Sequence, residues 1–228
     1  MDKLYMILLC LMIVPILICI KYSRRIKSDV ASSIVKCLIV TILSNGLSAF
    51  SGNETFSYIM EALYRFSFDL MLIYVLQYSQ QYTRVFHEVS PFKKGCFIIA
   101  YLDGILLFLN IIFHNVFTIE TVRFPNFDMY HVADKSIIFY FHYVFAYGLV
   151  FCIIASFIIK IIQIPDFYRK KYLPILVLMC VITVSKFICG ILEFPIDVSL
   201  PFFVCAAILI CYLTLYRSPR ELVDKTLS

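Results

Sequence analysis

Seven apolar stretches, each about as long as the hydrocarbon core of a bilayer is thick, fill most of this chain. Hydrophobic residues make up 62% of the 228 residues, charged residues make up 15%, and the mean hydropathy is +0.90. This composition excludes an ordinary soluble domain. We predict an all-α membrane protein, a seven-transmembrane helix bundle. Its spans are predicted near Leu4–Ile20, Val30–Phe50, Ser57–Tyr78, Cys96–Asn115, Ser136–Ile159, Tyr172–Leu192 and Val198–Tyr216.

The first stretch is interpreted as a retained helix and not as a cleaved signal. A single basic residue, Lys3, precedes it, and it lacks a small-x-small cleavage site. With seven spans in the bilayer, the chain has room for one bundle over residues 1–216 and for no folded extramembrane domain.

The basic residues predict the orientation of the bundle. Fourteen of the 20 Lys and Arg residues lie in alternate gaps or after the last span, and three lie on the opposite side (Lys3, Arg123 and Lys135). Because Lys and Arg are retained in the cytoplasm, the N-terminus is predicted outside and the C-terminus inside a multi-pass cell-membrane protein. This asymmetry also explains the net charge of +5, so we expect membrane lipid as a partner and no nucleic acid.

Cysteine and histidine spacing indicates no metal centre. All nine cysteines lie in or at the edge of apolar stretches, and neither a CxxC nor a Cys/His metal-binding spacing is present. Cysteine in such places usually acts as a small hydrophobic residue. We therefore expect no disulfide, no metal and no cofactor.

Charged residues inside the spans are the most informative feature for function, because each is costly in a bilayer unless it faces the bundle interior. The third span carries Glu61, Arg65 and Asp69 at successive spacings of four, which places an acid, a base and an acid on one helical face. We call Glu61, Arg65 and Asp69 the charged ladder. Two interpretations stay open for it: a structural row of salt bridges, or part of a binding site.

Further polar residues are predicted at a similar depth. Lys186 and His142 fall in the outer half of their spans, while Asp103 lies near mid-depth of the fourth span. We predict an outward-facing pocket with Glu61, Arg65, His142 and Lys186 as candidate ligand-binding residues. Asp69 and Asp103 are candidate interior coupling residues. Lys36 is close enough to the cytoplasmic end of its span to reach the interface and is interpreted as structural.

The segment from Val116 to Lys135 is the longest predicted outer loop and is rich in aromatic residues. Two readings stay open for it. It folds over the pocket as a lid, or it anchors the chain at the membrane surface, where aromatic residues are enriched.

After the last span, Ser218-Pro219-Arg220-Glu221 matches a capping box with proline in the first helical turn. The sequence therefore predicts that a new helix begins there, and that residues 217–228 start a cytoplasmic connector. An alternative reading is a short frayed tail.

The second half of the chain resembles the N-terminal seven-transmembrane sensor region of bacterial histidine kinases and diguanylate cyclases. The resembling segments are the aromatic span around Phe139–Tyr147, the run Tyr168-Arg169-Lys170-Lys171 leading into Leu173-Pro174, the turn from Glu193 to Phe202, and Leu215-Tyr216-Arg217 before Pro219. The resemblance implies a sensory domain that binds an external or membrane-borne small molecule. It also implies a cytoplasmic kinase or GGDEF output module as partner, which this chain does not contain. A homodimer is compatible with it, because kinase outputs of that family act as dimers.

Other functions are weighed against the receptor. A small-solute or proton-coupled transporter is the main alternative, since intramembrane acids and bases also mark transport paths, but no internal repeat is evident. A retinal photoreceptor is disfavoured because the seventh span has no lysine. Glu61-Ala62-Leu63-Tyr64-Arg65 matches the ExxxR part of a glutamate-type membrane protease, but Met60 stands where such enzymes have a second glutamate, and no HExxH motif is present. We therefore predict no enzyme and assign no catalytic residue.

Overall fold

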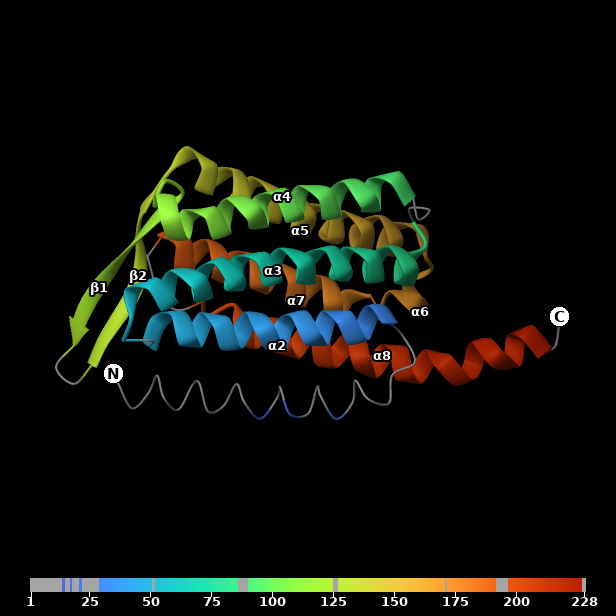
Figure 1. Ribbon diagram of the computed structural model, residues 1–228. Helices are drawn as coiled ribbons and strands as arrows, with labels where there is room; N and C mark the ends of the chain where they lie inside the picture. The colour runs from blue at the N-terminus through green and yellow to red at the C-terminus, as the bar shows by residue number, and fades with distance from the viewer. Residues whose placement is uncertain are drawn as a thin grey trace.

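The computed structural model describes residues 29–50, 52–85, 90–124, 127–170, 172–191 and 197–226, together with residues 14, 17 and 21. The predicted first span, Leu4–Ile20, lies almost wholly outside these residues. The elements along the chain are α2 (Asp29–Phe50), α3 (Glu54–Thr83), α4 (Ser90–Phe113), β1 (Phe117–Phe124), β2 (Phe127–Lys135), α5 (Ile137–Gln163), α6 (Asp166–Arg169), α7 (Leu173–Ile191) and α8 (Leu200–Thr226). The long helices run side by side, and the two strands lie across one end of the bundle (Figure 1).

Helix α3 forms the centre of the bundle and packs against α2, α4 and α5. Its start is defined by Asn53, whose side chain accepts a hydrogen bond from the Phe56 amide at 3.1 Å. Its end is defined by Arg84, which takes a left-handed backbone conformation with φ 53°. Because neighbours surround α3, its polar residues can face protein instead of lipid.

Three helices in the described part of the chain are long and apolar enough to cross a membrane: Asp29–Ala49, Pro91–Phe113 and Ile137–Gln163. Two shorter apolar helices span Leu173–Cys189 and Leu200–Leu213. Helix α3 is not among the three, and the charged ladder within it accounts for its lower hydropathy.

Exposure of side chains is the reverse of that in a water-soluble protein. Ile112 and Phe151 on the outer faces of α4 and α5 are 72% and 71% exposed, whereas Asp69 and Asp103 are 0% and 2% exposed. Apolar residues outside and charged residues inside form the arrangement that a lipid environment requires. The chain is therefore a helical membrane protein.

The helices match six of the predicted spans in position, since α2, α3, α4, α5, α7 and α8 each overlap one. The all-α fold class is confirmed, but the prediction missed one element. Strands β1 and β2 form an antiparallel hairpin, with Phe117 opposite Lys135 and Phe124 opposite Phe127. The alternation of apolar and polar residues from Phe117 to Glu120 and the turn residues Pro125-Asn126 are the signals that could have predicted it.

The prediction that a new helix begins after Ser218 is wrong. Helix α8 continues without interruption from Leu200 to Thr226, so residues 217–226 extend it beyond the bundle (Figure 1). Proline removes one backbone hydrogen bond from a helix interior and usually kinks or breaks the helix, yet α8 is continuous across Pro219. A capping pattern therefore did not mark a boundary here.

Candidate functional site

A cavity of about 110 Å³ lies at the hairpin end of the bundle. On the scale of one water molecule per roughly 10–15 Å³ of such space, it holds on the order of ten waters or one small molecule. It is lined by side chains from α2, α3, α5, α7 and α8, from the hairpin and from the turn before α8. The polar lining residues are Asn45, Ser48, Ser57, Glu61, Tyr64, Arg65, Tyr130, His131, Lys135, His142, Tyr143, Tyr147, Thr183, Lys186 and Asp197.

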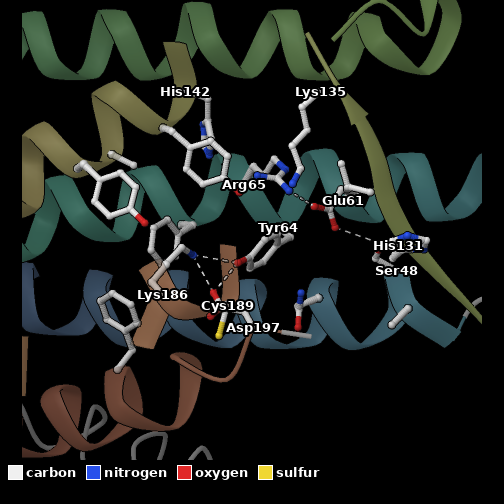
Figure 2. A pocket seen from close by; sticks show the side chains of 18 of the residues that line it. Ser48, Glu61, Tyr64, Arg65, His131, Lys135, His142, Lys186, Cys189 and Asp197 are labelled. Carbon is white, nitrogen blue, oxygen red and sulfur yellow. Dashed lines mark hydrogen bonds and ion pairs between the residues drawn. The ribbon is translucent and has the colours of Figure 1, made fainter. Parts of the chain in front are cut away.

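Glu61 and Arg65 form a buried ion pair on one wall of this cavity (Figure 2). Arg65 Nη2 donates to Glu61 Oε1 at 2.5 Å, and Ser48 Oγ donates to Glu61 Oε2 at 3.3 Å. The guanidinium carbon lies 4.3 Å from the centre of the Phe139 ring and 5.7 Å from that of Phe117, which favours the cation further. Arg65 Nε is buried and has no hydrogen-bond partner among the described residues.

On the opposite wall, Lys186 and Asp197 form a second ion pair, with Lys186 Nζ 2.7 Å from Asp197 Oδ2. Tyr64 donates its hydroxyl proton to the same oxygen at 2.5 Å and accepts a hydrogen bond from Lys186 at 3.0 Å. Asp197 Oδ1 accepts hydrogen bonds from the Ser199 amide and hydroxyl. We call Tyr64, Lys186, Asp197 and Ser199 the Asp197 cluster.

The charges and hydrogen bonds of the Asp197 cluster set the pKa of its carboxyl group. Burial alone would raise the pKa of Asp197. The Lys186 ammonium and the hydrogen bonds from Lys186, Ser199 and Tyr64 outweigh burial and hold that pKa below its usual value. Asp197 is therefore a carboxylate at neutral pH, and it connects α3, α7 and the start of α8.

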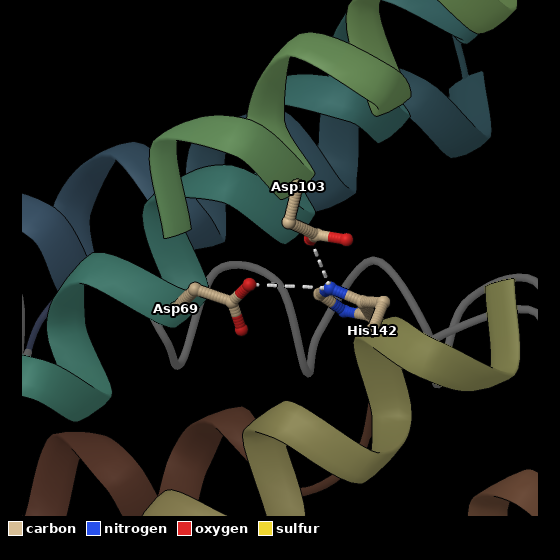
Figure 3. A group of neighbouring side chains, drawn as sticks. All are labelled: Asp69, Asp103 and His142. Atoms are coloured by element: carbon tan, nitrogen blue, oxygen red, sulfur yellow. Dashed lines mark hydrogen bonds and ion pairs between the residues drawn. The ribbon is translucent and has the colours of Figure 1, made fainter. Parts of the chain in front are cut away.

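Deeper in the bundle, the His142 imidazole meets two carboxyl groups (Figure 3). His142 Nδ1 lies 2.8 Å from Asp103 Oδ2 and 3.2 Å from Asp69 Oδ2. The three residues come from α3, α4 and α5, and each is at least 95% buried. We call Asp69, Asp103 and His142 the Asp69 cluster.

The four candidate ligand-binding residues, Glu61, Arg65, His142 and Lys186, all line the one cavity. Their role in binding stays a prediction. The ladder on α3 is divided in two, because Arg65 pairs with Glu61 while Asp69 faces His142. Asp69 and Asp103 do not line the cavity. Both contact His142, and His142 does line it.

Sequence reasoning missed the polar connections made by Tyr64 and Asp197. Tyr64 precedes Arg65 and so occupies a different face of α3, where the spacing of the charged residues gave no signal. Lys36, interpreted as structural, is exposed on α2 and does not line the cavity.

The hairpin folds over the cavity, as one of the two readings of segment 116–135 predicted. Ile119, Tyr130, His131, Val132 and Lys135 contribute to the lining. The Ile119 amide donates to Tyr58 Oη at 3.0 Å. Asn110 at the end of α4 accepts from the Val116 amide at 2.6 Å and donates to the Phe117 carbonyl at 2.8 Å. These bonds to α3 and α4 hold the base of the hairpin over the site.

No protein-family model matches the chain, and no curated protein sequence matches it. The resemblance to sensor regions of histidine kinases and diguanylate cyclases accordingly stays a prediction, and the function rests on the site itself.

Proposed function

We propose that this chain is a receptor module that binds a small molecule in the cavity beneath the hairpin. The observation that carries the proposal is the convergence of two buried ion pairs, Glu61–Arg65 and Lys186–Asp197, on one cavity. Charges are costly inside a membrane protein, and they are usually retained where they recognise a ligand or an ion. Aromatic walls with a few converging polar groups are typical of small-molecule sites.

The ligand is expected to carry an acceptor group, such as a carboxylate, for Arg65. Its buried Nε has no hydrogen-bond partner among the described residues, although the neighbouring Nη2 is bound to Glu61. Guanidinium groups bind carboxylates through two nitrogens of the same planar group. The rings of Phe117, Phe139 and Tyr143 around Arg65 would exclude water from that contact.

The Asp197 cluster offers a route from the cavity to the C-terminal helix. Lys186 lies on α7, Tyr64 on α3, and Ser199 immediately precedes α8. A ligand that changes the Lys186–Asp197 contact would act on the first turn of α8, and α8 continues as one helix to Thr226. Such a relay requires two helix arrangements with different ligand affinity.

The proposal includes the finer features expected from the sequence. The chain crosses the cell membrane seven times, with its N-terminus outside, its C-terminus inside and its hairpin on the outer side. The partner of α8 is a cytoplasmic kinase or cyclase output module, and a homodimer is the state in which such outputs act. The charge asymmetry and the exposed apolar faces of α4 and α5 support this reading.

The test is a thermal-stability screen of the purified chain in detergent against carboxylates, amino acids and lipids, because a ligand that binds the folded state raises its melting temperature. Arg65→Gln and Lys186→Gln are expected to abolish the shift produced by a hit. Lys36→Gln, which removes an exposed basic residue of α2, is the matched control and is expected to keep the shift.

Two results would contradict the proposal. One is a broad panel that yields no stabilising compound although the wild-type protein is folded. The other is a hit that moves across vesicle membranes in a manner dependent on Arg65, which would identify a transporter.

A further inference from the structure

We propose that Asp69, Asp103 and His142 bind a divalent transition-metal ion of the zinc type. The site lies beneath the ligand cavity and does not depend on the receptor function. Cysteine and histidine spacing gave no sign of it, because its three residues come from three different helices and meet only in the folded bundle (Figure 3).

The side chains supply a suitable set of ligand atoms. One imidazole nitrogen and two carboxylate oxygens lie within 4.8 Å of one another. Nitrogen and oxygen ligands of this kind bind zinc and related ions at about 2.0–2.2 Å, so two ligand atoms of a tetrahedral ion lie about 3.4 Å apart. The observed separations of 2.8 Å and 3.2 Å from His142 Nδ1 would need to open by about 0.6 Å and about 0.2 Å to reach that spacing.

The hydrogen bonding of Asp69 is the second observation that points to a ligand. Both of its carboxyl oxygens are buried, and neither accepts a well-formed hydrogen bond from the described residues, although Oδ2 lies 3.2 Å from His142 Nδ1 in an ion pair. His142 Nδ1 carries at most one proton, and its hydrogen bond goes to Asp103. A buried carboxylate without hydrogen bonds is costly, and native structures generally satisfy such groups with a partner, water or an ion.

A divalent ion would neutralise the cluster without protonating either carboxyl group. Two carboxylates beside one protonated imidazole carry a net charge of −1, whereas two carboxylates and a neutral imidazole around a divalent ion carry none. A neutral group is far less costly in a low-dielectric interior. Coordination through Nδ1 leaves the second ring nitrogen, Nε2, protonated.

The ion would also join three helices at the centre of the bundle. Asp69 lies on α3, Asp103 on α4 and His142 on α5, and α3 packs against both of the others. The fourth position of a tetrahedral ion would be taken by water or by a molecule in the cavity, because His142 also lines the cavity.

The test is a titration of the untagged chain, freed of metal with a chelator, with Co²⁺ followed by visible absorption. We expect saturation at one ion per chain, displacement by Zn²⁺, and a higher melting temperature in the metal-bound protein. Asp69→Asn and His142→Gln are expected to weaken Co²⁺ binding at least about 100-fold, since each removes a direct ligand.

Matched controls remove the same chemical groups elsewhere. Glu54→Gln removes an exposed acid from α3, and His114→Gln removes an exposed imidazole, so both are expected to bind Co²⁺ as the wild type does. Arg65→Gln should lose ligand binding in the cavity and keep the metal, which separates this proposal from the receptor function.

The proposal is overturned if the folded wild-type chain shows no saturable Co²⁺ absorption and retains no Zn²⁺ by elemental analysis. It is also overturned if the two ligand variants bind Co²⁺ as tightly as the controls. The wild-type measurement decides the matter even where a variant fails to fold.

Discussion

The two clusters of buried charge differ in how completely their polar atoms are satisfied. In the Asp197 cluster, one acid faces one base, and each Asp197 oxygen accepts two hydrogen bonds. In the Asp69 cluster, two acids share one imidazole nitrogen, and Asp69 accepts no hydrogen bond from the described residues. The comparison teaches that burial of charge alone does not define a role. The Asp197 cluster joins helices through complete hydrogen bonding, whereas the Asp69 cluster leaves buried carboxyl oxygens that require an explanation.

The largest expected effect comes from breaking the satisfied cluster. Asp197→Asn leaves the Lys186 ammonium without its counter-ion in a largely buried position. It should lower the free energy of unfolding by about 3 kcal/mol, measured by thermal or denaturant unfolding in detergent.

A double variant tests whether the unpaired Lys186 ammonium causes that loss of stability. Lys186→Met combined with Asp197→Leu replaces the pair by apolar side chains and is expected to recover most of the lost stability, as replacements of buried ion pairs often do. A single variant as stable as wild type would show that the pair contributes nothing.

The second effect concerns the close approach of α3 and α4 beside the Asp69 cluster. A Cβ atom added at Gly104 would lie 2.5 Å from Cδ2 of Phe66, so Gly104→Ala forces that ring to move. We expect a loss of about 2 kcal/mol. Gly148→Ala in α5, where a Cβ meets nothing within 4 Å, is the control and should be neutral or slightly stabilising. Equal melting temperatures for the two variants would contradict the tight contact.

The third expected change in the free energy of unfolding is that of Asp69→Asn. It is smaller than the change caused by Asp197→Asn and has the opposite sign. In metal-free protein, Asp69→Asn removes a buried carboxylate that lacks hydrogen bonds and relieves the excess negative charge of its cluster. The variant should be as stable as wild type or more stable by about 1 kcal/mol, measured by melting in the presence of a chelator. A loss as large as that of Asp197→Asn would erase the distinction between the clusters.

The smallest expected effect is a dependence of stability on pH, and this dependence is confined to acidic pH. The pKa of Asp197 in the folded protein lies below its ordinary value of 3.8. The pair therefore contributes its full stability above pH 3.8, and this contribution is lost as the pH falls through the lower folded pKa. The stability difference between wild type and Asp197→Asn should be constant from about pH 8 to about pH 5 and should narrow below about pH 4. A difference that narrows near pH 6 would assign the titration to another group.

Sequence patterns predicted the positions of the helices in the chain better than they predicted which side chains contact one another. Apolar length located α2, α3, α4, α5, α7 and α8, and the spacing of four placed Glu61 beside Arg65. The same spacing did not show that Asp69 turns to His142, because that choice depends on the rotation of α5 against α3. The hairpin was missed because its aromatic residues suited a membrane anchor equally well, although its alternation was visible.

The sequence by itself determined a helical membrane protein with charged residues inside its helices, because bilayer thickness and the cost of exposed backbone allow few other structures for so apolar a chain. The tertiary structure alone decided which charges meet. Arg65 and Lys186 face one cavity, Tyr64 joins Asp197, and Asp69, Asp103 and His142 converge from three helices. Partners far apart in sequence are fixed by helix rotation and packing, and residue spacing carries information only along a single helix.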